Sequence, residues 1–289
     1  MRVSIVWKPV RGRRPPDVRQ ARFRSVLLAA LNSRCYGPVL RSAGLGTPEE
    51  IKRLHSIEEA LAGIPRAEPG YLRMDTGAAA NRTAPAAGPH ELFWPLPPAR
   101  RTAVLLPGFR MRKGVRTFNG TNASKLTFWA PEALAGPVTA LQRLADQVED
   151  RWSHMPALSH SVLAFVVLRQ GFLSDEARDR FWRVFRVPVF GQIFGLSGEL
   201  LAWECEAHEG YHIEEDRAVI EIDHHLGQSE LLVTSLAGLR RPTIRLASGL
   251  AASIEHSPCG CGREGPRLVD VRRKTRQLIV AARAACAAD

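Results

Sequence analysis

Two short segments contain most of the side chains that could bind a metal ion. The first reads WECEAHEGYHIEED (residues 203–216), and the second reads HSPCGCGREGPRL (residues 256–268). Together they hold three of the five cysteines in the chain. Because five is an odd and low number of cysteines, the count argues against a disulfide framework and favours reduced thiols or a metal site. Thiolate sulfur and imidazole nitrogen are preferred zinc ligands.

The composition is typical of a folded protein without a membrane segment. The chain has 289 residues, of which 45% are hydrophobic, so it can bury a substantial core. Its first residues lack a signal-peptide pattern, and no segment has the roughly 18 consecutive apolar residues of a membrane span. We therefore expect a cytoplasmic protein that does not bind a membrane.

The formal net charge of +11 suggests nucleic-acid binding as one possible function, because arginine and lysine neutralise phosphates. The basic residues are spread along the chain, however, and only residues 11–14 and 272–276 form groups. Neither group is interleaved with the aromatic residues that stack on bases. A basic nucleic-acid-binding scaffold is therefore kept only as an alternative.

Helical patterns dominate the beginning of the chain. Apolar residues recur at helical spacing between Val18 and Leu31, with arginines on the other side. Ser56 is placed to cap a further helix, since Glu59 follows it by three residues. We predict an N-terminal helical region over residues 1–65. The stretch 66–98 lacks periodicity and is predicted to be a linker or mobile loop.

The middle of the chain alternates between buried strands and helices. Short apolar runs such as VLAFVVL (residues 162–168) are typical of strands, and Ser174 is placed to cap a helix with two acids in its first turn. Alternation of this kind predicts an α/β core over residues 99–203, with helices layered on a largely parallel sheet. From 204 to 270, short strands separated by Gly or Pro predict a small, mostly antiparallel β-subdomain. A C-terminal helix is predicted over 271–289.

The order of segments between Leu173 and Leu268 resembles the phenylacetate–CoA ligase branch of the adenylate-forming enzymes. These segments are LSDEARDRFWRVFRVPVFGQIFGLSGELLAWECEAHEGYHIEED, AVIEID, SELLVTSL, PTIRLASG and CGCGREGPRL. The earlier stretch LNSRCYGPVLRSAGLGTPEEIKRLHSIEEALAGIP is similar to the opening helical region of that branch. Together they cover somewhat over half of the chain, and the combination of ECEA, GYHIEED and CGCGR in this order is specific. The resemblance implies the large domain of such an enzyme.

Members of this family use ATP to convert a carboxylate into an acyl-adenylate and then pass the acyl group to coenzyme A. By resemblance, Phe194, Gly195 and Ser197 belong to the segment that packs on adenine, and Arg245 belongs to the ribose segment. The implied ligands are ATP or AMP with Mg²⁺ and a small-molecule carboxylate.

The sequence departs from the family pattern at several positions. Gly198 stands where the metal-binding glutamate is expected, with Glu199, a possible catalytic residue, one position later. Leu250 stands at the position where the family has the aspartate that binds the ribose, and leucine cannot accept hydrogen bonds from ribose hydroxyls. The nearest candidate for a phosphate loop, FNGTNAS (residues 118–124), is also explained as a polar turn. The lysine-bearing small domain of the family is not expected either.

These departures imply a degenerate adenylate-forming protein that acts as a binding or partner subunit. The alternative is a minimal acyl- or aryl-CoA ligase completed by a separate small domain. Glu199 would then be a catalytic residue.

The resemblance also implies that the two cysteine-bearing turns lie together at the edge of the β-subdomain. Three thiolates and one imidazole form a closed tetrahedral zinc site, which stabilises short loops and leaves no position for a catalytic water. The predicted ligands of this structural zinc are Cys205, His212, Cys259 and Cys261. His208 and His256 are alternative ligands, whereas the adjacent His224 and His225 would point to opposite faces of a strand. The competing interpretation is that the cysteines are small buried apolar residues.

Overall fold

The computed structural model describes most of the chain, and all structural statements refer to that part of it. The described residues are 16–68, 92–106, 109, 113–118, 123–150, 157–169, 171–225, 228–239 and 241–274.

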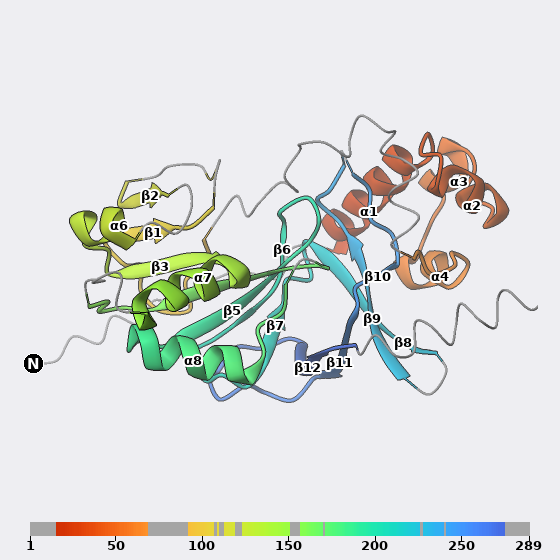
Figure 1. The fold of residues 1–289 in the computed structure, drawn as a ribbon. Helices are drawn as coiled ribbons and strands as arrows, with labels where there is room; N and C mark the ends of the chain where they lie inside the picture. The colour runs from red at the N-terminus through yellow and green to blue at the C-terminus, as the bar shows by residue number, and fades with distance from the viewer. Residues whose placement is uncertain are drawn as a thin grey trace, which may run out of the picture.

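Four helices form the N-terminal region: α1 (Pro16–Ala30), α2 (Tyr36–Ser42), α3 (Pro48–Lys52) and α4 (Ile57–Ala62). Ser56 caps α4 as predicted, because its hydroxyl accepts the backbone N–H of Glu59 at 3.2 Å. The helices bury Phe23, Leu27 and Tyr36 in a cluster that also contains Val219 and Ile244, which come from much later in the chain. The helical region therefore packs against C-terminal parts of the protein (Figure 1).

A nine-stranded sheet forms the centre of the described structure. Its strands are β1 (Thr102–Val104), β2 (Val115–Thr117), β3 (Ala133–Pro137), β4 (Val162–Val167), β5 (Val189–Phe194), β6 (Leu200–Glu204), β7 (Tyr211–Ile213), β11 (Leu250–Glu255) and β12 (Arg267–Arg273). The strand order is β11-β12-β7-β6-β5-β4-β3-β1-β2. Neighbouring strands are parallel from β2 to β5 and antiparallel from β5 to β11.

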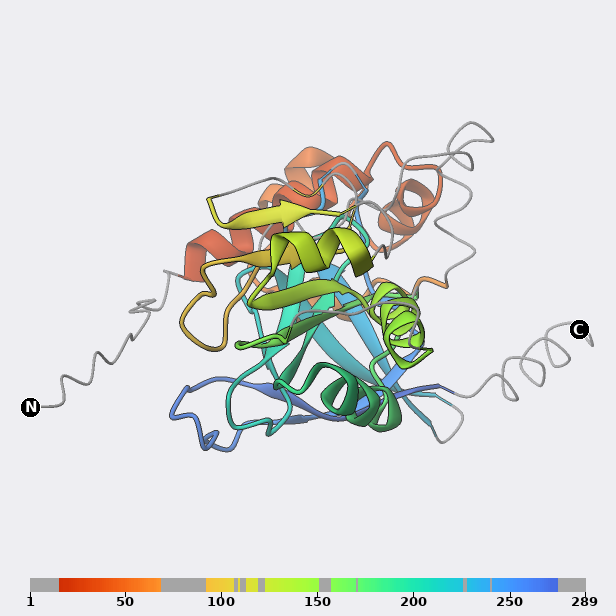
Figure 2. The ribbon, with the colours of Figure 1, turned by 60° about the vertical axis from the view of Figure 1, so that its left-hand side comes forward.

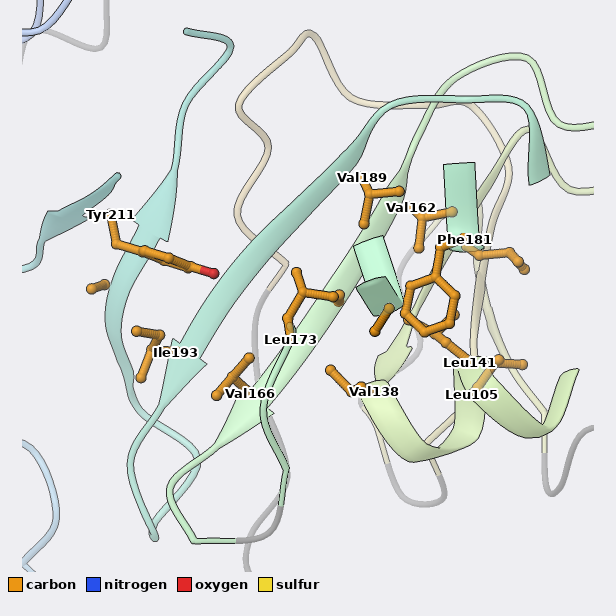
Figure 3. Packing of buried hydrophobic residues seen from close by; sticks show 14 of the residues in the cluster. Leu105, Val138, Leu141, Val162, Val166, Leu173, Phe181, Val189, Ile193 and Tyr211 are labelled. Atoms are coloured by element: carbon orange, nitrogen blue, oxygen red, sulfur yellow. The ribbon is translucent and has the colours of Figure 1, made fainter. Parts of the chain in front are cut away.

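Helices α7 (Val138–Glu149) and α8 (Asp175–Phe185) cover one face of this sheet (Figure 2). Val138 and Leu141 of α7 and Phe181 of α8 pack with Val162 and Val189 of the strands beneath them (Figure 3). The Ser174 hydroxyl caps α8 as predicted, since it accepts the N–H of Ala177 at 3.2 Å. A third helix, α6 (Ala123–Trp129), precedes β3. The predicted α/β class is confirmed.

A second, three-stranded antiparallel sheet has the order β10-β9-β8. Its strands are β8 (Ala218–His225), β9 (Gln228–Ser235) and β10 (Leu246–Ala247). The sequence assigned all strands after residue 204 to one small subdomain. Instead, β7, β11 and β12 continue the large sheet, because β6 folds back on β5 and leaves a further edge on which β7 and then β12 pair.

Parts of two predicted segments differ from expectation. Arg66 to Glu68, at the start of the predicted linker, are ordered: Ala67 donates to the Arg245 carbonyl at 2.9 Å and accepts from the Ala247 N–H at 2.9 Å. Residues 69–91 of that linker lie outside the described part. The predicted C-terminal helix does not begin at residue 271, because residues 271–273 pair with β11 as part of β12. Residues 275–289 lie outside the described part, and the division of the chain into domains stays a prediction.

Candidate functional site

Two tight turns position the cysteine and histidine side chains. Cys205 directly follows β6, and the His208 N–H donates to the Cys205 carbonyl at 3.1 Å before Gly210, with a φ of 95°, leads into β7. In the second turn, the Gly262 N–H donates to the Cys259 carbonyl at 2.8 Å. The Glu209 carboxylate accepts the Gly260 N–H at 2.8 Å and so joins the two turns.

The structure brings together the four predicted metal ligands. One ligand atom from each of Cys205, His212, Cys259 and Cys261 lies within 4.8 Å of the others. The Sγ atoms of Cys205 and Cys259 are 3.5 Å apart, and the Cys261 Sγ lies 3.4 Å from the His212 Nε2. Cys261 is partly buried and the other three are buried. This cluster could hold a metal ion.

The protonation of the cluster is set by burial and by two arginines. Burial, together with the positive charges of the nearby Arg263 and Arg267 guanidiniums, lowers the pKa of His212 to about 4. The imidazole is therefore neutral at pH 7, as a metal ligand must be. Burial raises the pKa of the Cys205 thiol to about 12. Burial acts to raise the pKa of Cys261 too, but hydrogen bonds from Arg263 outweigh it and the pKa is lowered.

The alternative histidine ligands lie elsewhere. His208 is exposed and its ring stacks on Phe190, with a centroid separation of 4.8 Å. His224 and His256 are exposed as well, and neither belongs to the cluster. The side chain of His225 lies outside the described part.

The turn after β5 carries the residues assigned by resemblance to the adenine segment. Phe194 is 1% exposed and packs edge-on against Phe165, with centroids 5.2 Å apart. Glu199 is buried, and its carboxylate accepts the Ser197 N–H at 3.0 Å. A Cβ atom on Gly195 would lie 2.1 Å from the Glu199 Oε1, so this arrangement requires glycine at position 195. The Glu199 carboxylate is thus directed back onto its own turn.

Comparison with known proteins gives the fold. No protein-family model matches the sequence, and no curated protein matches it. An open conformation of 2-hydroxyisobutyryl-CoA ligase in complex with 2-HIB-AMP and CoA matches with a TM-score of 0.64 and 16% identity, over 90% of this chain and 69% of that chain. The same ligase in the thioesterification state matches with a TM-score of 0.64 and 16% identity, over 90% and 68%. The chain therefore has the fold of an adenylate-forming CoA ligase.

The remaining residues assigned to the nucleotide site make structural contacts within this ligase fold. The Arg245 guanidinium pairs with the Glu221 carboxylate at 3.2 Å and donates to the Ile64 carbonyl, which ties the helical region to the small sheet. Leu250 is 4% exposed, and its N–H donates to the Ser248 hydroxyl at 3.0 Å. Of the predicted polar loop FNGTNAS, residues 119–122 lie outside the described part.

A polar hollow at the opposite end of β5 was not predicted from the sequence. It has a volume of about 660 Å³ and lies between α8 and the strands β5, β6, β7 and β12. On its floor, the Arg178 guanidinium pairs with the buried Glu204 carboxylate at 2.6 Å, beside the buried Tyr211. Helical spacing could have placed Arg178 on the inner face of α8, but no local signal pairs it with Glu204.

Among the described residues, none of the helices has both the length and the apolar character that a membrane span needs.

Proposed function

We propose that this protein binds one structural zinc ion and serves as a binding or partner subunit built on the fold of the CoA ligases. Its ligand would be a small-molecule carboxylate, a nucleotide or a partner protein. We further propose that it does not form acyl-adenylates by itself. In this proposal it belongs to the phenylacetate–CoA ligase branch and has lost the ATP chemistry of that branch.

The zinc proposal is supported by the donor set. Three sulfur atoms and one imidazole nitrogen match the ligands and the number that tetrahedral structural zinc takes. All four coordination positions are then filled by protein, so the ion would have no place for a reacting water. Zinc at this point would connect the end of β6 and the start of β7 with the loop before β12. Its contribution would therefore be to hold strands together.

The loss of adenylation is supported by what the nucleotide-segment residues contact. The observation that carries this part of the proposal is the burial of Phe194, which packs on Phe165 and has almost no surface for an adenine ring. Glu199 accepts a hydrogen bond from its own turn, and a buried leucine stands at position 250. Adenylation depends on preorganised charge around the reacting phosphate, and loss of one such group typically costs on the order of a hundredfold in rate.

ATP–pyrophosphate exchange with a panel of aryl and acyl carboxylates tests this proposal. We expect exchange at the background rate, and calorimetry should detect weak ATP binding or none. Micromolar ATP affinity, together with carboxylate-dependent exchange that disappears in Glu199→Ala, would instead establish a minimal ligase. Zinc content measured on the same preparation tests the metal proposal independently, because a structural ion is retained whether or not the protein turns over.

A further inference from the structure

Four side chains form a row across the sheet that includes one residue of the metal cluster. In the strand register, Gln192 of β5 is paired with Trp203 of β6, Trp203 with His212 of β7, and His212 with Arg267 of β12. Directly paired residues of neighbouring strands project from the same face of a sheet and contact one another. The row therefore leads from the middle of the sheet to a candidate metal ligand.

A segment that we call the strap, residues 92–98, lies over the first half of this row. The Phe93 ring lies 3.9 Å from the Trp203 ring, between centroids, and the Phe93 carbonyl accepts the Gln192 side-chain N–H at 2.5 Å. At its other end the Pro97 carbonyl lies 2.7 Å from the His160 Nε2, and Trp94 meets the His160 ring edge-on. The strap is thus held at two separate places.

Trp203 joins the strap to the metal cluster. Its ring stacks on the His212 ring with centroids 5.0 Å apart, and the Arg263 guanidinium lies over it at 5.1 Å. The indole N–H donates to the Glu214 carboxylate at 2.9 Å. The indole is buried and closely packed, so it cannot keep its position when the His212 ring against it turns. A turn of the His212 ring would therefore shift the indole, on which the Phe93 ring packs.

We propose that metal binding at the cysteine–histidine cluster tightens the strap through the contacts from His212 to Trp203 and from Trp203 to Phe93. This inference depends on the zinc ion proposed above. A metal–nitrogen bond fixes the orientation of the imidazole ring, and loss of the metal frees the ring that supports Trp203. The strap then loosens at Phe93 and remains attached at His160.

Loosening the strap would uncover a polar group inside an apolar face. The side-chain oxygen of Gln192 is buried without a hydrogen-bond partner among the described residues, next to Phe190 and Phe194 on the same strand. Such a group costs free energy while it is covered. Metal occupancy would therefore decide whether this part of the sheet is covered by the strap or exposed to solvent.

Thermodynamic reciprocity provides a test that does not require metal-free protein. If zinc binding shifts the equilibrium of the strap toward its packed position by some factor, packing of the strap must raise the zinc affinity by the same factor. We expect Phe93→Ala to weaken zinc binding by about fivefold or more, measured by competition with a chromophoric chelator. Trp94→Ala, which removes a strap contact that does not involve Trp203, should change zinc affinity by less than about twofold. Equal zinc affinities in wild type and Phe93→Ala would overturn the coupling, whereas failure of the wild type to bind zinc would overturn the metal proposal itself.

Chymotryptic cleavage after Phe93 measures the strap directly. We expect a zinc-selective chelator to accelerate this cleavage in the wild type by about fivefold or more, while cleavage after Phe181 and Phe185 in α8 stays slow. In Trp203→Leu, cleavage after Phe93 should be fast with or without zinc. Unchanged cleavage after Phe93 in chelated wild type would contradict the proposal. So would equal acceleration at α8, because zinc would then act on the whole fold and not on the strap.

Discussion

Cys259 and Cys261 supply two of the four candidate ligands from one tight turn. Replacing Cys259 by serine exchanges a thiolate for a hydroxyl, which is a poor zinc ligand. We therefore expect bound zinc to fall from one ion per chain to below about a tenth, measured by elemental analysis after gel filtration. Cys35→Ser is the matched control, because it makes the same change at a buried cysteine of the helical cluster that is not one of the four candidate ligands. A Cys259→Ser protein that keeps its zinc would contradict the assignment.

Glu230 is a buried carboxylate that connects three segments of the chain. It pairs with Arg66 at 2.7 Å and Lys274 at 2.6 Å, and it accepts the Gly249 N–H at 3.3 Å. Burial acts to raise the pKa of Glu230, but hydrogen bonds from Lys274 and Arg66 outweigh it, so the pKa lies below its ordinary value of 4.5. A lowered carboxyl pKa stabilises the folded state above the unfolded value, and this stability is lost as pH falls through the lowered pKa.

Glu230→Gln should therefore lower the free energy of unfolding at pH 7 by about 1–3 kcal/mol, less than for a fully buried pair because both cations reach solvent. The variant should also lose less stability than the wild type when the pH falls below about 4.5. Urea denaturation at several pH values measures both effects. Asp146→Asn removes an exposed partner of Arg180 and should cost less than about 1 kcal/mol. If the two variants were equally stable, the buried pair would have no special role.

At the residue scale, the sequence predicts the ligands but not their surroundings. Cysteines and glycines on tight turns, together with the resemblance, were sufficient to select the cluster. The contact of Phe93 with Trp203 was not predictable, because it depends on the register between β5 and β6 and on a strap more than ninety residues from its partner.

Between elements, the approach of β7 to β5 depends on a single glycine. The Tyr211 hydroxyl passes so close to Gly191 that a Cβ atom there would lie 2.4 Å from it. Gly191→Ala should therefore destabilise the protein by about 1–3 kcal/mol, as overpacking typically does, and thermal denaturation measures the loss. Gly63→Ala is the control, since its Cβ would meet nothing nearer than 3.7 Å. Equal melting temperatures for the two variants would show that Tyr211 can move aside.

Helix starts and parallel strands were predictable because their signals are local. Ser56 and Ser174 cap helices where expected, and the apolar run at residues 162–168 contains β4. Which sheet a late strand joins is not a local property. The pairing of β12 with β7 connects residues more than fifty positions apart, and nothing in the alternation of either strand specifies that partner.

For the whole molecule, metal removal should lower stability without abolishing the fold. Zinc binds the folded state in preference to the unfolded chain, so chelation lowers the melting temperature. The core between α7, α8 and the parallel strands does not involve the cluster, and we expect it to remain folded. A decrease of about 5–10 °C is expected for the wild type, and none for Cys259→Ser. Calorimetric scans with and without chelator provide the measurement, and a wild-type melting temperature that does not respond to chelator would contradict it.

The contact of the first helices with the last strands has a consequence for synthesis on the ribosome. The Tyr36 hydroxyl exchanges hydrogen bonds with Ile244, at 3.1 Å from its N–H and 3.2 Å to its carbonyl. These residues are 208 positions apart, and at about 5–20 residues per second the ribosome needs roughly 10–40 s to make the chain between them. Throughout that interval the helical cluster lacks Val219, Leu236 and Ile244, which belong to it in the folded protein. Nascent chains arrested before β8 should therefore bind a hydrophobic-segment chaperone and be cleaved in the helical region more rapidly than full-length released chains.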